Sequence, residues 1–194
     1  REFFYEGQGL TTFASFEDAK ENLIVVDSIS KRFSACGARV GILVSRNREL
    51  MAQALKICQG RLCAATLDQL GAAALYGVGS DYFSAVREEY HRRRDTCMEG
   101  LSQIPGVVCE CPKGAFYLMA KLPVDDTDKF QTWLLEEFQD NGETVMFAPG
   151  EGFYGTPGKG RDEVRLAYIL KQADLRRAME VLAHGIEAYN SRKL

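Results

Sequence analysis

From Asp27 to Gly41 the sequence reads DSISKRFSACGARVG, and this stretch decides the fold. It lies between two short apolar runs, 23–26 before it and 42–44 after it. Runs of β-branched and aliphatic residues that are bounded by polar residues and glycines predict buried strands. Strands that are apolar on both faces are typical of a parallel sheet covered by helices on each side. We therefore predict a loop held between two strands of a core sheet.

The predicted loop carries groups that suit one kind of ligand. Lys31 would be partly desolvated at the end of a buried strand, and a desolvated amine can form a Schiff base with a carbonyl. The planar guanidinium of Arg39 can clamp a phosphate, and the hydroxyls of Ser28 and Ser30 can bind its remaining oxygens. A ligand with both an aldehyde and a phosphate fits this set, and pyridoxal 5'-phosphate is the obvious candidate.

The same stretch resembles the lysine-attachment motif of class I aminotransferases, the aspartate aminotransferase family. The matching positions are Ser28-x-Ser30-Lys31-x-x-Ser34-Ala35-x-Gly37-x-Arg39-Val40-Gly41. The resemblance implies that Lys31 is the catalytic residue that forms the Schiff base and then moves the proton. It also implies that Ser28, Ser30 and Arg39 bind the cofactor. A lysine near an arginine also occurs in ordinary strand-loop-strand segments, but the number of matching positions favours the functional interpretation.

A second arginine is expected at the substrate. Arg165 alternates with Val164 and Leu166, so it should lie on the opposite face of a half-buried strand. A single arginine in such a place is often only a surface residue. In the family, however, the arginine that binds the substrate carboxylate lies in a similar strand after a Pro-Gly-x-x-Phe segment, and 149–153 reads PGEGF here. The resemblance therefore implies that Arg165 binds the substrate carboxylate, for which its planar fork is suited.

Composition argues against several other classes of protein. Of the 194 residues, 46% are hydrophobic and 26% are charged, which is typical of a globular protein. A net charge of −3 gives no reason to expect nucleic acid or an anionic membrane as a partner. No apolar run approaches the roughly 20 residues of a membrane span. Six cysteines without a secretory signal predict reduced, buried thiols in the cytoplasm, and two histidines away from ligand spacing predict no metal site.

The rest of the chain predicts two domains. Apolar residues at helical spacing predict helices over 47–60 and 66–76 and a long helix from Asp81. After that helix we expect a compact α+β unit. Its expected strands are 107–111, 116–122, 144–148 and 163–169, with helices that begin near Asp126 and Asp174.

The hinge-like Gly77-x-Gly79 sets the predicted boundary between the domains. We expect 1–79 to be the C-terminal part of a large cofactor-binding domain, and 80–194 to be a small C-terminal domain that starts in a long linking helix. The predicted fold class is α/β plus α+β, as in the C-terminal portion of fold-type-I transferases that depend on pyridoxal phosphate.

The resemblance also implies an activity and partners. We expect amino transfer between an L-amino acid, with aspartate as a guess from the family, and a 2-oxo acid, in a homodimeric enzyme. Two alternatives stay open: a pyridoxal-phosphate-dependent carbon–sulfur lyase, and the aminotransferase-like effector domain of a transcription regulator. An N-terminal DNA-binding domain would distinguish the regulator.

The family also has an Asp-x-x-Tyr element that contacts the cofactor ring, and it would fall just before Arg1. We therefore expect this chain to be the C-terminal half of a longer enzyme and to be inactive alone. Without that half, an exposed apolar sheet edge would favour self-association.

Overall fold

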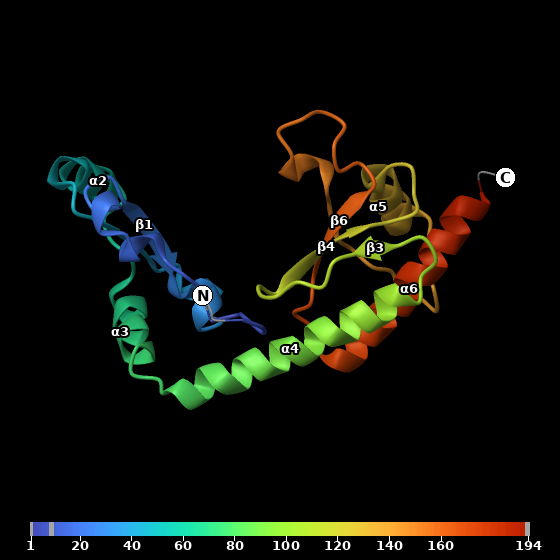
Figure 1. Ribbon diagram of the computed structural model, residues 1–194, viewed down its shortest axis with the longest axis horizontal. Helices are drawn as coiled ribbons and strands as arrows, with labels where there is room; N and C mark the ends of the chain where they lie inside the picture. The colour runs from blue at the N-terminus through green and yellow to red at the C-terminus, as the bar shows by residue number, and fades with distance from the viewer. Residues whose placement is uncertain (1, 8–9, 193–194) are drawn as a thin grey trace. The chain divides into compact units, whose positions relative to one another are not determined.

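The computed structural model describes residues 2–7 and 10–192 (Figure 1). They form two compact units. Unit 1 comprises Arg1–Glu2 and Gln8–Ser84, and unit 2 comprises Phe3–Gly7 and Ala85–Leu194. The division falls inside the helix α4 (Ser80–Ser102), a few residues after the predicted hinge. The assignment of 1–79 and 80–194 to a large and a small domain stays a prediction.

Unit 1 consists of one pair of strands and several helices. The elements before α4 are η1 (Phe13–Ser15), η2 (Glu17–Ala19), β1 (Ile24–Ser28), α1 (Ile29–Arg32), η3 (Cys36–Ala38), β2 (Gly41–Ser45), α2 (Arg48–Gly60) and α3 (Thr66–Leu75). The two predicted strands and the helices after them are confirmed. The stretch between the strands, predicted as a loop, forms α1 and the 3-10 turn η3.

The prediction that β1 and β2 are buried parallel strands is wrong. They pair antiparallel, from Ile24 opposite Ser45 to Ser28 opposite Gly41, as a two-stranded sheet. Val26 is 75% exposed and Val44 is 54% exposed. The reason is that no layer of the described residues covers these apolar side chains. The buried core of unit 1 is small and consists of Ile29, Phe33 and Ala72.

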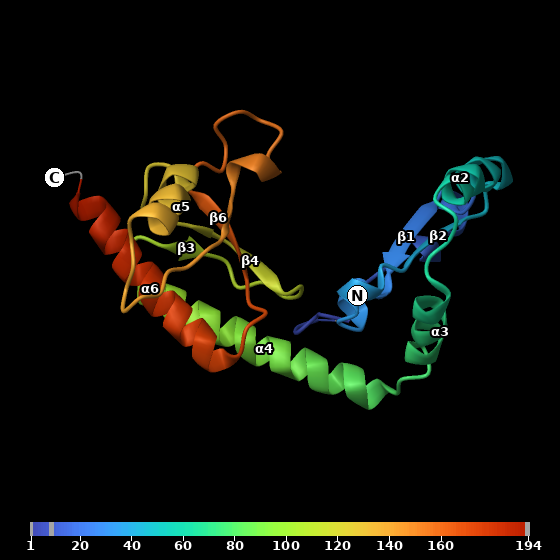
Figure 2. The same ribbon diagram turned by 180° about the vertical axis from the view of Figure 1, so that it is seen from behind.

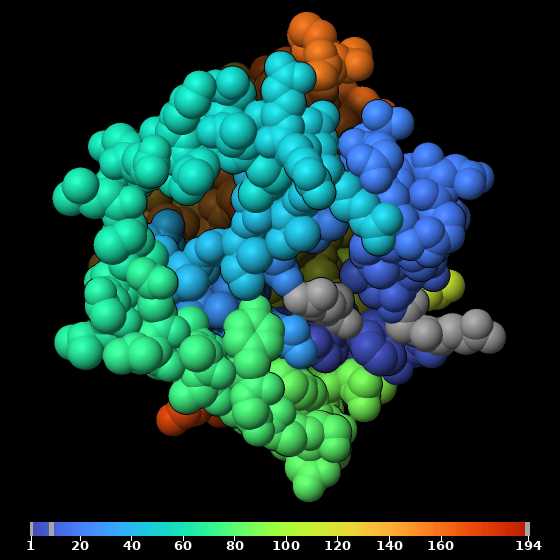
Figure 3. Space-filling model, turned by 90° about the vertical axis from the view of Figure 1, so that its left-hand side faces the viewer, coloured from blue at the N-terminus to red at the C-terminus, as the bar shows by residue number. Residues whose placement is uncertain are grey.

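The helix α2 begins where the sequence predicted. Asn47 is its N-cap, and the Asn47 Oδ1 accepts a hydrogen bond from the backbone N–H of Leu50 at 2.9 Å. Much of the surface in Figure 3 is formed by the segment from β2 to α3, coloured cyan to green. This segment exposes large apolar side chains, among them Leu55, Ile57, Leu62, Leu67 and Leu70.

Unit 2 is an α+β unit around a four-stranded antiparallel sheet with the order β3-β4-β6-β5. Its elements after α4 are β3 (Val108–Cys109), β4 (Tyr117–Lys121), α5 (Thr127–Glu136), β5 (Ala148–Pro149), η4 (Glu151–Phe153), β6 (Glu163–Ala167) and α6 (Gln172–Ser191). The predicted strand–strand–helix–strand–strand–helix order is confirmed, and each strand is shorter than expected.

The shortening is largest at β5, predicted over 144–148. There the chain bonds to α5 instead of to a strand. The Phe147 N–H donates to Gln131 Oε1 at 2.7 Å, and Thr144 Oγ1 donates to the Leu134 carbonyl at 2.9 Å. The Gln131 side chain of α5 thus uses the Phe147 N–H that an extended pairing would need, and only Ala148–Pro149 pairs with β6.

Alternation along β4 and β6 separates a buried face from an open face. Leu118 and Ala120 on β4 and Val164 and Leu166 on β6 are buried in one core with residues of α4, α5 and α6. All three helices therefore cover the same face of the sheet, and α6 lies along α4 in both ribbon views (Figure 2). The other face carries Arg165.

Three further predictions concern thiols, metals and membranes. All six cysteines are free thiols, but only Cys97 is buried, so the prediction that they are buried is wrong for most of them. Burial raises the pKa of the Cys97 thiol to about 12. Within the residues that the structure describes, no cluster of three metal-ligating side chains occurs, and no helix is long and apolar enough to cross a membrane.

Candidate functional site

The predicted cofactor residues Ser28 and Ser30 meet at the start of α1. Ser28 is the N-cap of this helix, and its Oγ accepts a hydrogen bond from the Ser30 N–H at 3.0 Å. The two hydroxyl oxygens lie 2.8 Å apart, and Ser28 Oγ also reaches the Val40 carbonyl at 3.3 Å. Capping chemistry in the sequence thus brings both hydroxyls to one point beside β2.

Lys31 and Arg39 both contact Cys36. The Lys31 Nζ donates to Cys36 Sγ at 3.7 Å, and the Arg39 Nη1 donates to the Cys36 carbonyl at 3.1 Å. The Cys36 thiol in turn donates to the Ser30 carbonyl at 3.2 Å. The turn between the strands therefore gathers the predicted amine and guanidinium around one residue. Sequence reasoning missed Cys36, because it occupies an unconstrained position of the motif.

Arg39 has a strained backbone. Its φ is +53° and its ψ is +36°, in the left-handed region that residues with a side chain rarely adopt, and Ser34 also has a φ of +53°. Such a conformation costs roughly 1–3 kcal/mol and persists where the surroundings impose it. Here it ends η3 and carries the chain into β2, with the guanidinium folded back to Cys36.

The prediction that Lys31 is partly buried is wrong for this chain. Lys31 and Arg39 are both exposed, while Ser28 and Ser30 are half-buried. The cause is the one that exposes β1 and β2: within the described residues, no second layer lies over this end of the sheet.

Arg32, next to Lys31, anchors α1. Its guanidinium carbon lies 5.0 Å from the Phe83 ring centroid and 5.2 Å from that of Phe33, within cation–π range. Its Nη2 lies 3.1 Å from the Glu2 carboxylate. Its Nε is buried and has no hydrogen-bond partner among the described residues. Sequence reasoning gave Arg32 no role, because nothing in the motif constrains its position.

Arg165 lies on β6 with the predicted orientation, exposed and opposite the buried Val164 and Leu166. Its guanidinium carbon is 4.5 Å from the centroid of the Phe153 ring and 5.3 Å from that of Tyr117. Neither ring was predicted as part of a site, although Phe153 ends the Pro-Gly-x-x-Phe segment. The predicted cofactor residues lie in unit 1, whereas Arg165 lies in unit 2.

The close contacts of Gly150 explain why the Pro-Gly-x-x-Phe segment has a glycine at this position. A Cβ built on Gly150 would lie 2.6 Å from the Glu163 carbonyl oxygen and 2.8 Å from the Gly160 carbonyl oxygen. Only a residue without a side chain lets β5 and η4 approach β6 this closely.

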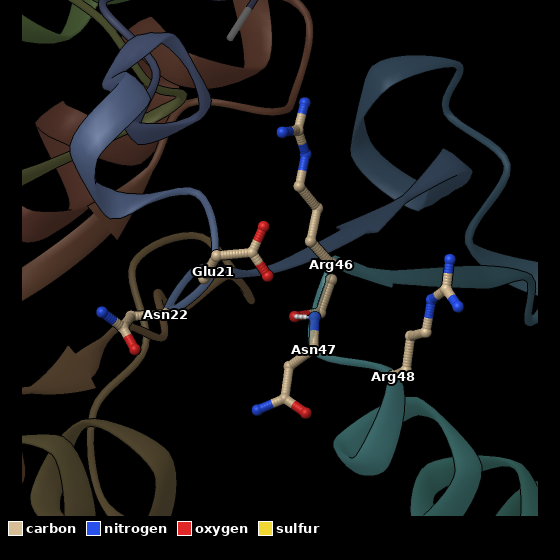
Figure 4. A pocket seen from close by; sticks show the side chains of 6 residues that line it. Glu21, Asn22, Arg46, Asn47 and Arg48 are labelled. Atoms are coloured by element: carbon tan, nitrogen blue, oxygen red, sulfur yellow. Dashed lines mark hydrogen bonds between the residues drawn. The ribbon is translucent and has the colours of Figure 1, made fainter.

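Two of the hollows in unit 1 are lined mainly by residues outside the predicted site. Figure 4 shows one at the ends of the β-strands, where the Asn47 side chain points away from those of Arg46 and Arg48. The Asn47 N–H there donates to Ser45 Oγ at 3.2 Å. The other lies beside Arg39 and is also lined by the segment from Cys58 to Asp68. No predicted residue except Arg39 lines either hollow.

The site of unit 1 thus joins an amine, two hydroxyls and a guanidinium on one strand–turn–strand segment, as an enzyme that binds an aldehyde with a phosphate requires. The model of the family "Aminotransferase class I and II" matches residues 1–182, and this chain belongs to that family. Members of the family depend on pyridoxal phosphate.

Similar proteins agree with this assignment. The aspartate aminotransferase of Bacillus subtilis is 29% identical over 96% of this chain and 47% of its own length. An aromatic aminotransferase of Pyrococcus horikoshii has a solved structure that matches with a TM-score of 0.82 and 26% identity, over 97% of this chain and 49% of that one.

The α-aminoadipate aminotransferase LysN of Thermus thermophilus, solved with N-(5'-phosphopyridoxyl)-L-leucine, shares the fold with a TM-score of 0.82 and 24% identity. The match covers 98% of this chain and 49% of LysN. The chain thus spans about half the length of the relatives that it matches.

Proposed function

We propose that this chain supplies the cofactor lysine and the carboxylate-binding arginine of an aminotransferase that acts on an L-amino acid and a 2-oxo acid. The observation that carries the proposal is the convergence of Lys31 and Arg39 on Cys36, whose thiol donates to the Ser30 carbonyl, together with the paired hydroxyls of Ser28 and Ser30. The family match over residues 1–182 supports the same chemistry.

The donor set fits pyridoxal phosphate. A phosphate needs several hydrogen-bond donors and a positive charge, which two hydroxyls and a guanidinium provide. An aldehyde needs a primary amine, which Lys31 provides, and Lys31 and Arg39 both contact Cys36. Ser28, Ser30 and Arg39 would hold the phosphate, and the Lys31 amine would bind the aldehyde carbon.

When bound, the cofactor supplies an electron sink for the substrate carbon. The contribution of this chain is to bind, to orient and to move a proton. Arg165 would bind the α-carboxylate through two parallel hydrogen bonds, which fixes the direction of the Cα–H bond. Lys31 Nζ would take the proton from Cα as general base and deliver it, as general acid, to the carbon that was the aldehyde carbon of the cofactor.

The finer features of the enzyme are part of the same proposal. Aspartate is proposed as the amino acid, because several relatives are aspartate aminotransferases. A homodimer in the cytoplasm is proposed for the whole enzyme, with 1–79 in its large domain and 80–194 in its small domain. Six free thiols are compatible with a reducing compartment.

The test is to reduce the intact enzyme with borohydride in the presence of pyridoxal phosphate and to map the labelled peptide. The label should be on Lys31. The Lys31→Ala variant should lose both the label and turnover, whereas Lys56→Ala, which removes an exposed lysine of α2, should keep both. Label on another lysine of the wild-type enzyme would refute the role of Lys31.

A further inference from the structure

Arg165 lies between two aromatic rings that come from opposite sides of its strand. In the sheet order β3-β4-β6-β5, β6 lies between β4 and β5. Tyr117 belongs to β4, and Phe153 belongs to η4, which follows β5 directly. The Arg165 guanidinium carbon is within cation–π range of both ring centroids, at 5.3 and 4.5 Å.

We propose that Tyr117 and Phe153, here called the aromatic clamp, are positioning residues that hold the Arg165 guanidinium for a substrate carboxylate. This inference rests on the proposed role of Arg165. An aromatic ring that covers the face of a guanidinium displaces water from that face, while the N–H groups at the edge stay available. A carboxylate binds that edge through two parallel hydrogen bonds. The clamp thus reduces the side-chain freedom that carboxylate binding would otherwise remove.

Phe153 is fixed from both ends of its short helix. Before it, Gly150 packs against the Glu163 carbonyl so closely that a Cβ would clash. After it, the Tyr154 hydroxyl donates to the Glu163 carboxylate. Both anchors are on β6, two residues before Arg165, so the Phe153 ring is held to the strand that carries the arginine.

Tyr117 is fixed by the sheet itself. It pairs with Ala167 across β4 and β6, while Met119 lies directly opposite Arg165. Its ring packs edge-on against the Phe116 ring, with 5.4 Å between centroids. Tyr117 is 41% exposed and Phe153 is 48% exposed, so neither ring is mainly a core residue. This exposure fits rings that serve a surface arginine.

The chain offers matched controls for the clamp. Met119 lies on the same strand and the same open face, opposite Arg165, but it has no ring. Tyr117→Phe keeps the ring, and Tyr117→Leu keeps an apolar side chain without a π face. Arg165→Lys keeps the charge and loses the planar fork.

The experiment measures acetate as a competitive inhibitor of the intact enzyme, because acetate has a carboxylate and no side chain. Tyr117→Leu and Phe153→Leu should each raise the inhibition constant about two- to fivefold. Tyr117→Phe and Met119→Ala should leave the constant close to that of the wild type. If a ring variant turns over too slowly, titrating acetate against the Arg165 Nε–H NMR signal gives the same affinity.

The outcomes separate the clamp from the function on which it rests. If Arg165→Lys weakens the binding of acetate and the two leucine variants do not, the clamp is refuted and Arg165 keeps its role. If Arg165→Lys has no effect, both are refuted. If Met119→Ala weakens the binding of acetate as much as Tyr117→Leu does, general packing explains the effect and the clamp is refuted.

Discussion

Unit 1 and unit 2 differ in how much core they contain. In unit 2 a continuous core joins α4, α5 and α6 to the sheet and includes the fully buried Phe130, Tyr168 and Tyr189. In unit 1 the buried core consists of Ile29, Phe33 and Ala72, while both strands carry exposed apolar side chains. Since burial of apolar surface is the main source of stability, the two units should differ greatly in stability.

The difference shows how each proposed group is held. Lys31 and Arg39 depend on local contacts: the Ser28 cap, the Arg32 anchor and the shared Cys36. Arg165 instead lies on a strand whose opposite face is packed into a complete core. Hydrogen exchange and single substitutions in each unit can test this contrast.

Amide hydrogen exchange of the 194-residue chain should separate the units most strongly. Amides of β1 and β2 should exchange at least about a hundredfold faster than those of β4 and β6, because local opening needs little energy where few apolar contacts are lost. Mass spectrometry of peptic fragments measures this directly. Equal protection of the two sheets would contradict the contrast, and faster exchange in the second sheet would reverse it.

Core substitutions should affect only their own unit. Phe130→Ala should lower the free energy of unfolding of unit 2 by about 3–5 kcal/mol, because Phe130 is fully buried against Trp133 and Tyr189. Urea unfolding followed by the fluorescence of Trp133, the single tryptophan, reports this unit.

Two substitutions serve as controls for that measurement. Leu135→Ala, at an exposed position of α5, should change the free energy by less than about 0.5 kcal/mol. Ile29→Ala removes a fully buried side chain of unit 1 and should leave the Trp133 transition in place. A shift of that transition by Ile29→Ala as large as that by Phe130→Ala would show that the two units unfold together.

The contrast also explains which sequence predictions succeeded. Where a segment packs against other residues of this chain, the sequence pattern predicted the local structure correctly. Asn47 caps α2, and the alternation around Arg165 gives a buried face and an open face of β6. Where burial depends on a covering layer, the sequence pattern predicted the strands but not whether that layer is present. The apolar run 23–26 predicted a buried parallel strand, and the structure has a partly exposed antiparallel one.

The candidate site was predictable to the same extent. The motif named Ser28, Ser30, Lys31 and Arg39, and the structure pairs the first two hydroxyls and brings Lys31 and Arg39 to Cys36. Cys36, Arg32 and the two rings of the clamp could not be found in this way. Their roles arise from contacts made by the turn and from pairing between strands far apart in sequence, and no spacing rule encodes those contacts.

Arg39→Ala should have a smaller effect than loss of the unit 2 core, but a clear one. Each charge-assisted hydrogen bond that Arg39 would make to the phosphate is worth about 1.5–3 kcal/mol. Affinity of the intact enzyme for pyridoxal phosphate should therefore fall more than about tenfold, as measured by equilibrium dialysis of the apoenzyme. Arg61→Ala is the matched control, since it removes an arginine of the neighbouring hollow that lies outside the motif. An unchanged dissociation constant for Arg39→Ala would remove this residue from the cofactor site.

The smallest expected effect concerns the acid stability of unit 2. Asp126 is the N-cap of α5, where its Oδ1 accepts hydrogen bonds from the N–H groups of Asp128 and Lys129, each at 3.1 Å. Its other oxygen accepts from Arg161 at 2.8 Å. That bond to Arg161, supported by the Lys129 N–H, lowers the pKa of the Asp126 carboxyl against the opposing effect of burial.

A lowered pKa in the folded state means that the carboxylate stabilises unit 2 at neutral pH. The stabilisation is fully present above the ordinary aspartate pKa of 3.8 and is lost as the pH falls through the lowered value. Asp126→Asn keeps a capping oxygen and removes the charge, so it should cost only a few tenths of a kcal/mol at pH 7. It should also flatten the loss of stability below pH 4. Asp126→Ala also removes the cap and should cost about 1 kcal/mol at pH 7, and less at pH 3, where the wild type has itself begun to lose the charge. Urea midpoints from Trp133 fluorescence at pH 7 and pH 3 measure both effects, and an acid dependence of Asp126→Asn equal to that of the wild type would assign the acid sensitivity to other carboxylates.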